Sequence, residues 1–145
     1  MKKCKHFGIK ELVSKIVFDR WGEKAWMFFD PDILEDLDTI REHWGSAIII
    51  NNWAVGGNLS QCGLRSNLDP LVKNTKSLYL SAHCMGKAFD LHAGNGKNKE
   101  LFNVVYNLIL QKKLKKFKRL EDFKSTPTWV HVDEFQIDNS IIFSV

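Results

Sequence analysis

Two histidines and one aspartate stand in two short segments that look like strands, and their residue types are those of a metal site. Residues 81–90 read Ser-Ala-His-Cys-Met-Gly-Lys-Ala-Phe-Asp and contain His83 and Asp90, and His131 follows within Trp-Val-His-Val-Asp at residues 129–133. Neutral imidazole and ionised carboxylate are good zinc ligands, and catalytic zinc takes three protein ligands and keeps one position for water or substrate. If the three side chains converge, the chain can hold Zn²⁺ with an open coordination position.

Each of these residues also has an ordinary structural explanation. A histidine in a strand is more often a surface or hydrogen-bonded core residue than a ligand, and an aspartate beside a turn usually stabilises that turn. Cys84 adjoins His83, but adjacent residues on a strand point to opposite faces. We therefore expect Cys84 to be a buried thiol and not a further ligand. Taken residue by residue, the composition favours a zinc site only weakly.

The bulk properties of the chain are those of a globular protein with one domain, residues 1–145. It has 145 residues, of which 44% are hydrophobic and 26% are charged, enough for one core. No apolar run approaches the roughly 18 residues of a membrane span, and the N-terminal segment has no clean apolar stretch of the secretory kind. We expect no membrane partner, no signal peptide and synthesis in the cytoplasm. Three cysteines, an odd number, argue against a disulfide framework.

The positive charge of the chain is concentrated in one segment. The formal net charge is +4, which fits an anionic partner such as nucleic acid or a wall polymer but requires neither. Within residues 112–119 the basic side chains are Lys112, Lys113, Lys115, Lys116, Lys118 and Arg119. Two interpretations stay open: the solvated end of a helix, where cations suit the helix dipole, or a binding patch. Because the segment carries no recognised nucleic-acid motif, we do not expect nucleic acid to be the partner.

Apolar spacing predicts two helices in the first third of the chain and one in its last third. Residues 9–20 carry apolar side chains at helical spacing. Residues 31–44 give the clearest helix, with Asp30 as N-cap, Pro31 at the first helical position and Gly45 after the last turn. A further helix is predicted from about Lys99 to Lys113, with Asn98 as its cap.

Short apolar or alternating segments predict the strands at residues 47–50, 88–92, 128–135 and 140–145. In the third of these, Trp129, His131 and Asp133 share one face and the valines share the other. Residues 51–80 are rich in asparagine and glycine, and a connection this long is often functional. The pattern predicts a mixed α+β domain.

The whole pattern is more specific than its parts. Ser-x-His-x-x-Gly-x-Ala-x-Asp at residues 81–90, followed by Trp-x-His at 129–131, resembles the zinc-dependent peptidoglycan peptidases. These include D-alanyl-D-alanine carboxypeptidases, dipeptidases of the same family and phage L-alanyl-D-glutamate endolysins. The resemblance covers about residues 45–135, and the opening at residues 6–12 is similar to that of phage-type members. It implies a hedgehog/DD-peptidase-like α+β fold with a small antiparallel sheet flanked by helices, Zn²⁺ as cofactor, a peptidoglycan peptide as substrate, and a monomer released from a phage-infected cell to the wall.

The resemblance also assigns roles to individual residues. His83, Asp90 and His131 match the three zinc ligands, and Ser81 matches a serine that supports the site and its substrate by hydrogen bonding. Arg65 looks like an arginine that holds the substrate and polarises the scissile carbonyl. A structural, salt-bridging role for Arg65 is an equal alternative.

One departure from the family pattern concerns the general base. Many relatives carry Glu or Asp three residues before the last zinc ligand, where this chain has Thr128, and others carry His two residues before it, where this chain has Trp129. Neither side chain can take a proton from water. Asp133, on the same strand face as His131 and about 6–7 Å along it, is the substitute candidate for the catalytic base or for orienting a ligand, and His92 is a second candidate.

Three functional hypotheses follow. The first is a zinc metallopeptidase of the D,D-carboxypeptidase or endopeptidase type that cleaves peptidoglycan peptides. The second is a catalytically inactive zinc-binding module of the same fold that binds cell-wall peptide or a protein partner, as Thr128 and Trp129 allow. The third is a nucleic-acid binder that uses the basic segment 112–119. The sequence does not indicate which peptide bond is cleaved.

Overall fold

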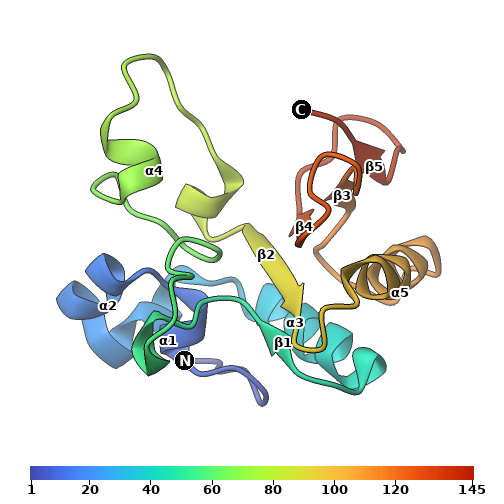
Figure 1. The fold of residues 1–145 in the computed structure, drawn as a ribbon, viewed down its shortest axis with the longest axis horizontal. Coiled ribbons are helices and arrows are strands. Elements are labelled where there is room, and N and C mark those ends of the chain that lie inside the picture. Colours follow the sequence, from blue (N-terminus) through green and yellow to red (C-terminus); the bar gives the residue numbers. More distant parts are fainter.

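A five-stranded sheet organises the fold and places the two motif segments side by side. A computed structural model describes residues 1–145, and its strands are β1 (Ile48–Ile49), β2 (Ala88–Ala93), β3 (Arg119–Glu121), β4 (Val130–Asp133) and β5 (Ile142–Phe143). Their order in the sheet is β1-β2-β4-β3-β5 (Figure 1). Every pair is antiparallel except β3 and β5, which run parallel. The α+β prediction is confirmed, and the prediction of a wholly antiparallel sheet is wrong at this last pair.

Helices precede and interrupt the sheet. The α-helices are α1 (Ile9–Leu12), α2 (Lys15–Trp21), α3 (Pro31–Trp44), α4 (Pro70–Lys73) and α5 (Asn98–Leu110), and the 3₁₀ helices are η1 (Gly22–Phe28), η2 (Trp53–Val55) and η3 (Ala82–Met85). In Figure 1 the segment with α4 extends away from the sheet before the chain returns to η3 and β2. None of these helices is long and apolar enough to cross a bilayer.

Helix α3 forms where its end signals predicted it. The Asp30 side chain accepts a hydrogen bond from the backbone N–H of Asp32, Pro31 occupies the first turn, and Gly45 ends the helix in the left-handed conformation, with φ of 75°. These residues satisfy backbone groups that a helix leaves unpaired at its ends. The predicted boundaries, residues 31–44, are therefore confirmed.

The single helix predicted over residues 9–20 is wrong, because the chain breaks between α1 and α2. The backbone N–H of Leu64 donates to Leu12 O, and the N–H of Ser14 donates to Leu64 O. Val13 thereby forms a parallel bridge with Leu64. The Ser14 hydroxyl then accepts from Val17 N and begins α2. The apolar spacing of the sequence gives no sign of this break, because Val13 is as buried as its helical neighbours.

The predicted helix 99–113 is α5, but its ends differ from the prediction. The helix already includes Asn98 and stops at Leu110. Asn98 does not cap it, because its side-chain oxygen accepts from the backbone N–H of Ala93 at 2.8 Å. This bond ties the helix start to the end of β2.

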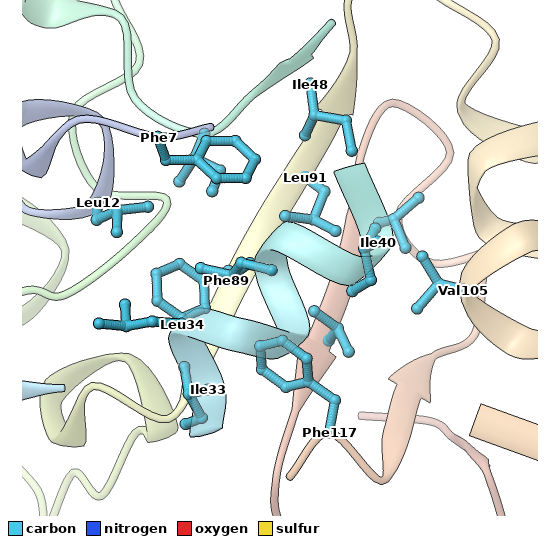
Figure 2. Close-up of a cluster of buried hydrophobic side chains, with 14 of the residues drawn as sticks. Phe7, Leu12, Ile33, Leu34, Ile40, Ile48, Phe89, Leu91, Val105 and Phe117 are labelled. Carbon is cyan, nitrogen blue, oxygen red and sulfur yellow. The ribbon is translucent and has the colours of Figure 1, made fainter. Parts of the chain in front are cut away.

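One face of the sheet packs into the hydrophobic core. Alternate residues of the strands point toward α3 and α5, among them Phe89, Leu91, Val130, Val132 and Leu120, all of which are at most 1% exposed. Figure 2 shows Phe89 and Leu91 on β2 beside Leu34 and Ile40 of α3, with Val105 of α5 beyond them. Side chains alternate between the two faces of a strand. The intervening residues therefore project from the opposite face, which carries the polar side chains of the motifs.

Two basic side chains of the segment 112–119 form ion pairs with Glu35 of α3 and with its N-cap Asp30. Lys115 Nζ lies 2.9 Å from Glu35 Oε2, and Lys116 Nζ lies 3.0 Å from Asp30 Oδ2. Arg119, the last residue of the segment, belongs to strand β3, which sequence patterning missed. These pairs favour the first interpretation of the segment, a solvated element end, over a continuous anion-binding patch.

Candidate metal centre

His83, Asp90 and His131 converge on the polar face of the sheet. Asp90 on β2 and His131 on β4 are directly paired in the antiparallel register, so their side chains emerge side by side from the same face. His83 approaches from η3. One potential ligand atom from each residue lies within 4.8 Å of the other two, and the three residues can hold a metal ion.

His83 is positioned by a tight helical turn and not by the strand that the sequence suggested. The Ser81 hydroxyl accepts from the His83 backbone N–H at 3.2 Å and caps η3. Gly86 ends the turn with φ of 68°, a left-handed conformation that glycine adopts without a steric penalty. The chain reverses within this turn and enters β2, which returns Asp90 to the side of His83.

The ring orientation of His83 is fixed by a backbone carbonyl. Its Nδ1 lies 2.9 Å from Gly63 O, and a carbonyl only accepts, so Nδ1 carries the proton and Nε2 presents a lone pair. Nε2 in turn lies 3.4 Å from Asp90 Oδ1. Glycine is required at residue 63 for this contact. A Cβ atom there would lie only 2.0 Å from the carbonyl oxygen of Leu12.

His131 lies between two carboxylates. Its Nδ1 is 2.9 Å from Asp90 Oδ1, and its Nε2 is 3.0 Å from Asp133 Oδ2. Burial would lower the pKa of His131, but the hydrogen bonds with Asp133 and Asp90 outweigh it and raise this pKa to about 9. Without metal the ring is therefore an imidazolium at neutral pH. A metal ion would replace the proton on Nδ1, while Asp133 keeps the proton on Nε2 in place.

Asp90 is ionised and central to the group. Burial would raise its pKa, but the hydrogen bond with His131 and the neighbouring His83 ring lower it well below the usual value. Arg65 adds a second cation, with Nη2 at 3.6 Å from Asp90 Oδ2. The guanidinium is also held by Gln61 O, which accepts from Nε at 2.6 Å, and is 9% exposed. Arg65 thus lies at the site and pairs with a candidate ligand, an arrangement compatible with both of its predicted roles.

Asp133, the predicted catalytic base, lines the pocket of the site, and neighbouring groups engage both of its carboxylate oxygens. Its side chain is 2% exposed and accepts from Arg119 Nε at 2.8 Å, besides its contact with His131. Burial would raise its pKa, but the hydrogen bonds of His131 and Arg119 lower it. Both carboxylate oxygens are occupied, since Oδ1 also accepts from Phe135 N at 3.0 Å. This geometry fits the other role predicted for Asp133, orienting a ligand.

The group opens into a pocket of about 480 Å³. Its wall includes the three candidate ligands, Arg65, Ser81, and two residues of β3 that sequence reasoning missed, Arg119 and Glu121. Ser81 reaches the pocket but bonds to the His83 backbone in the structure. His92 lies on the same side of β2, where its Nδ1 contacts Ile49 O at 3.2 Å and not the ligand group.

Glu121 is the pocket carboxylate without a partner. It is half-buried, and no hydrogen bond or ion pair engages it, in contrast to Asp90 and Asp133. Burial raises the pKa of Glu121, and the negative charges of Asp90 and Asp133 add to this effect. The alternation Arg-Leu-Glu at residues 119–121 was the available signal, but it is too short to distinguish from the end of the lysine-rich segment.

The cysteines do not contribute to the group. Cys84 is half-buried and stands apart from the three ligands, although it follows His83 directly. Burial raises the pKa of its thiol, so the thiolate that a metal would need is disfavoured. All three cysteines are unpaired, in agreement with the expectation of no disulfide framework.

Comparison of the chain with protein-family models, with curated proteins and with solved structures gives no match. The geometry of the site and the sequence motif are therefore the basis for inferring a function.

Proposed function

We propose that this chain is a zinc-dependent peptidase that hydrolyses peptide bonds of bacterial peptidoglycan, with a hedgehog/DD-peptidase-like fold. The observation that carries the proposal is the convergence of His83, Asp90 and His131 at the wall of an open pocket. Two imidazoles and one carboxylate form a ligand set of catalytic zinc sites, which keep a position for water or substrate. The motif that supplies the ligands is the one that resembles this peptidase family.

The spacing of the donor atoms supports a tetrahedral ion. With zinc–ligand distances of about 2.0–2.2 Å, the edges of a tetrahedral site measure about 3.3–3.6 Å. Asp90 Oδ1 lies 2.9 Å from His131 Nδ1 and 3.4 Å from His83 Nε2. The hydrogen bonds to Gly63 O and Asp133 orient both rings with the correct nitrogen toward the common point. The three side chains can therefore hold a metal ion, and a tetrahedral zinc would need His131 Nδ1 and Asp90 Oδ1 to separate by a few tenths of an ångström.

The roles of the surrounding side chains follow from their positions. When bound, zinc supplies a Lewis acid for the scissile carbonyl and lowers the pKa of water into the neutral range. Arg65 places its guanidinium at the pocket, where it would stabilise negative charge developing on the carbonyl oxygen, an effect worth about 3–4 kcal/mol for a single donor in other enzymes. Asp133 and Gly63 hold the histidine rings, so that their lone pairs stay aimed at the ion.

Hydrolysis of purified peptidoglycan tests the proposal. The zinc-loaded protein is expected to release free amino groups from intact sacculi, whereas His83→Ala is expected to release none. His43→Ala is the matched control, because His43 is an exposed histidine on α3 that contacts only the Thr39 carbonyl. Zinc and peptide binding by the wild type without release of amino groups would favour the inactive zinc-binding module instead.

A further inference from the structure

The candidate site holds a metal-ligand set and an arginine but lacks a proton acceptor at either family position. Thr128 and Trp129 occupy those positions, and neither side chain takes up a proton. Asp133, the nearest alternative in the sequence, is sequestered by Arg119 and His131. A peptidase needs a group that accepts the proton of the attacking water and passes it to the leaving amine, so another residue of the pocket would have to supply it.

Glu121 lines the pocket on the strand next to His131. In the β3–β4 register Arg119 is paired with Asp133 and Leu120 with Val132. Continuing this antiparallel register by one residue brings Glu121 level with His131, and directly opposed residues project from the same face of a sheet. Leu120 points into the core and is fully buried, so Glu121 points away from the core, toward the pocket that it lines.

The surroundings of Glu121 leave it available for proton transfer. The charged groups that act on it are His131, Asp90, Asp133 and His83, the members of the site. It nevertheless forms no hydrogen bond or ion pair with them, and it is not one of the three residues that share the metal position. Glu121 is therefore a pocket carboxylate that is neither a member of the ligand group nor held by another side chain.

On the basis of the proposed peptidase function, we propose that Glu121 is its general base, supplied by β3 in place of the residue that the motif lacks. Glu121 accepts a proton from water as the water oxygen forms a bond to the carbonyl carbon of the scissile peptide. The same proton then passes from Glu121 to the amide nitrogen as the carbon–nitrogen bond breaks. Water is thus divided between the new carboxyl group and the new amine, and Glu121 returns to its starting state.

The test compares Glu121→Gln with the wild type in three measurements. Gln keeps the shape of the side chain but cannot hold the transferred proton. Glu100→Gln is the matched control, because Glu100 is an exposed glutamate in the first turn of α5. Zinc affinity is measured by competition with a chelating dye, release of amino groups is measured on purified peptidoglycan, and proton uptake on binding of a phosphinate dipeptide is measured by calorimetry in buffers of different ionisation enthalpy.

We expect Glu121→Gln to bind zinc within about threefold of the wild type and to lose activity by about 100-fold or more, the range for removal of a general base. The wild type should take up a proton when the phosphinate binds, because Glu121 becomes protonated beside the tetrahedral anion, and the variant should take up none. Glu100→Gln should match the wild type throughout.

Three results would overturn the assignment, and they can be told apart. Loss of zinc by Glu121→Gln would make Glu121 a ligand and not a base. Activity within about threefold of the wild type, with unchanged proton uptake, would exclude Glu121 while leaving the peptidase function intact. A zinc-loaded wild type that releases no amino groups would remove the proposed function and the role of Glu121 together.

Discussion

Two groups of buried carboxylates in this chain differ in what donates to them. On α3, Asp36 is 1% exposed and accepts the backbone N–H groups of Lys115, Lys116 and Phe117 at 2.7–3.0 Å. On the polar face of the sheet, Asp90 and Asp133 accept from side chains, namely imidazole and guanidinium groups. The first group joins a helix to a passing chain segment, and the second surrounds a pocket.

Burial acts to raise the pKa in both groups, but the net pKa shifts have opposite signs. Burial raises the pKa of Asp36 in spite of its three backbone hydrogen bonds, whereas the histidines lower the pKa of Asp90 in spite of its burial. Backbone N–H groups are fixed dipoles that cannot leave, but a proton on an imidazole can be replaced by a metal ion. The first kind of buried carboxylate stabilises the fold. The second kind can exchange the proton of its histidine partner for a metal ion.

The largest effect on stability is expected for Asp36→Ala. It leaves three backbone N–H groups of residues 115–117 without an acceptor, and each unsatisfied buried donor costs about 1–3 kcal/mol. We expect the free energy of unfolding to fall by about 3 kcal/mol or more in urea titrations. The zinc affinity of the folded protein should not change, and a parallel loss of affinity would contradict the separation of the two groups.

Asp90→Asn should act on metal binding and much less on folding. It removes the charged ligand that both histidines face, so zinc affinity should fall by more than the roughly 10- to 100-fold that loss of an outer partner causes. Isothermal titration with zinc measures this, and urea unfolding of the metal-free protein measures the stability. Zinc binding at wild-type strength would place the ion elsewhere.

Asp133→Asn should have an intermediate effect. The neutral amide cannot form a charged hydrogen bond with the His131 ring, and it removes the ion pair of Arg119. Because His131 is then oriented less well, we expect zinc affinity to fall by about 10- to 100-fold. Activity per bound zinc should fall less than in Glu121→Gln. Unchanged affinity together with complete loss of activity would restore Asp133 as the base and contradict the positioning role.

The metal-free protein should lose stability as the pH rises from about 6.5 toward 9. The folded-state pKa of His131 is raised to about 9, so the protonated ring stabilises the fold below its unfolded pKa, and this contribution disappears as pH approaches the folded value. We expect a loss on the order of 1–3 kcal/mol, seen in urea titrations with chelator present. The same slope in His131→Ala would assign the effect to another group.

The smallest effect is expected for the exposed pairs beside the first group. Lys115 and Lys116 contact acidic side chains of α3 at the surface, and such pairs contribute about 0–1 kcal/mol. Changing both lysines to glutamine should lower the free energy of unfolding by no more than about 1 kcal/mol, with no change in zinc affinity. A larger loss would show that these side chains, and not only the backbone at residues 115–117, fasten the segment to α3.

The sequence predicted those parts of the fold that local signals determine. Helix α3 has a cap, a proline and a glycine at its ends, and β4 alternates over enough residues to show its two faces. The break at Val13 and the strand β3 depend on partners far along the chain, Leu64 in one case and β4 with β5 in the other. Local periodicity cannot report such partners, so both were missed.

The residues of the candidate site likewise fall into those that local sequence signals predict and those that depend on distant partners. The motif identified His83, Asp90 and His131, although it placed His83 on a strand and not in η3. The engagement of Asp133 by Arg119, and the position of Glu121 at the pocket, follow only from the pairing of β3 with β4. A residue whose role depends on a neighbouring strand carries no signature in its own segment.

The zinc site is tested most directly by an anomalous-difference map at the zinc absorption edge from crystals of the zinc-loaded protein. We expect one strong peak about 2.0–2.2 Å from His83 Nε2, His131 Nδ1 and an oxygen of Asp90. A peak elsewhere on the molecule, or none beside these three residues at saturating zinc, would contradict it.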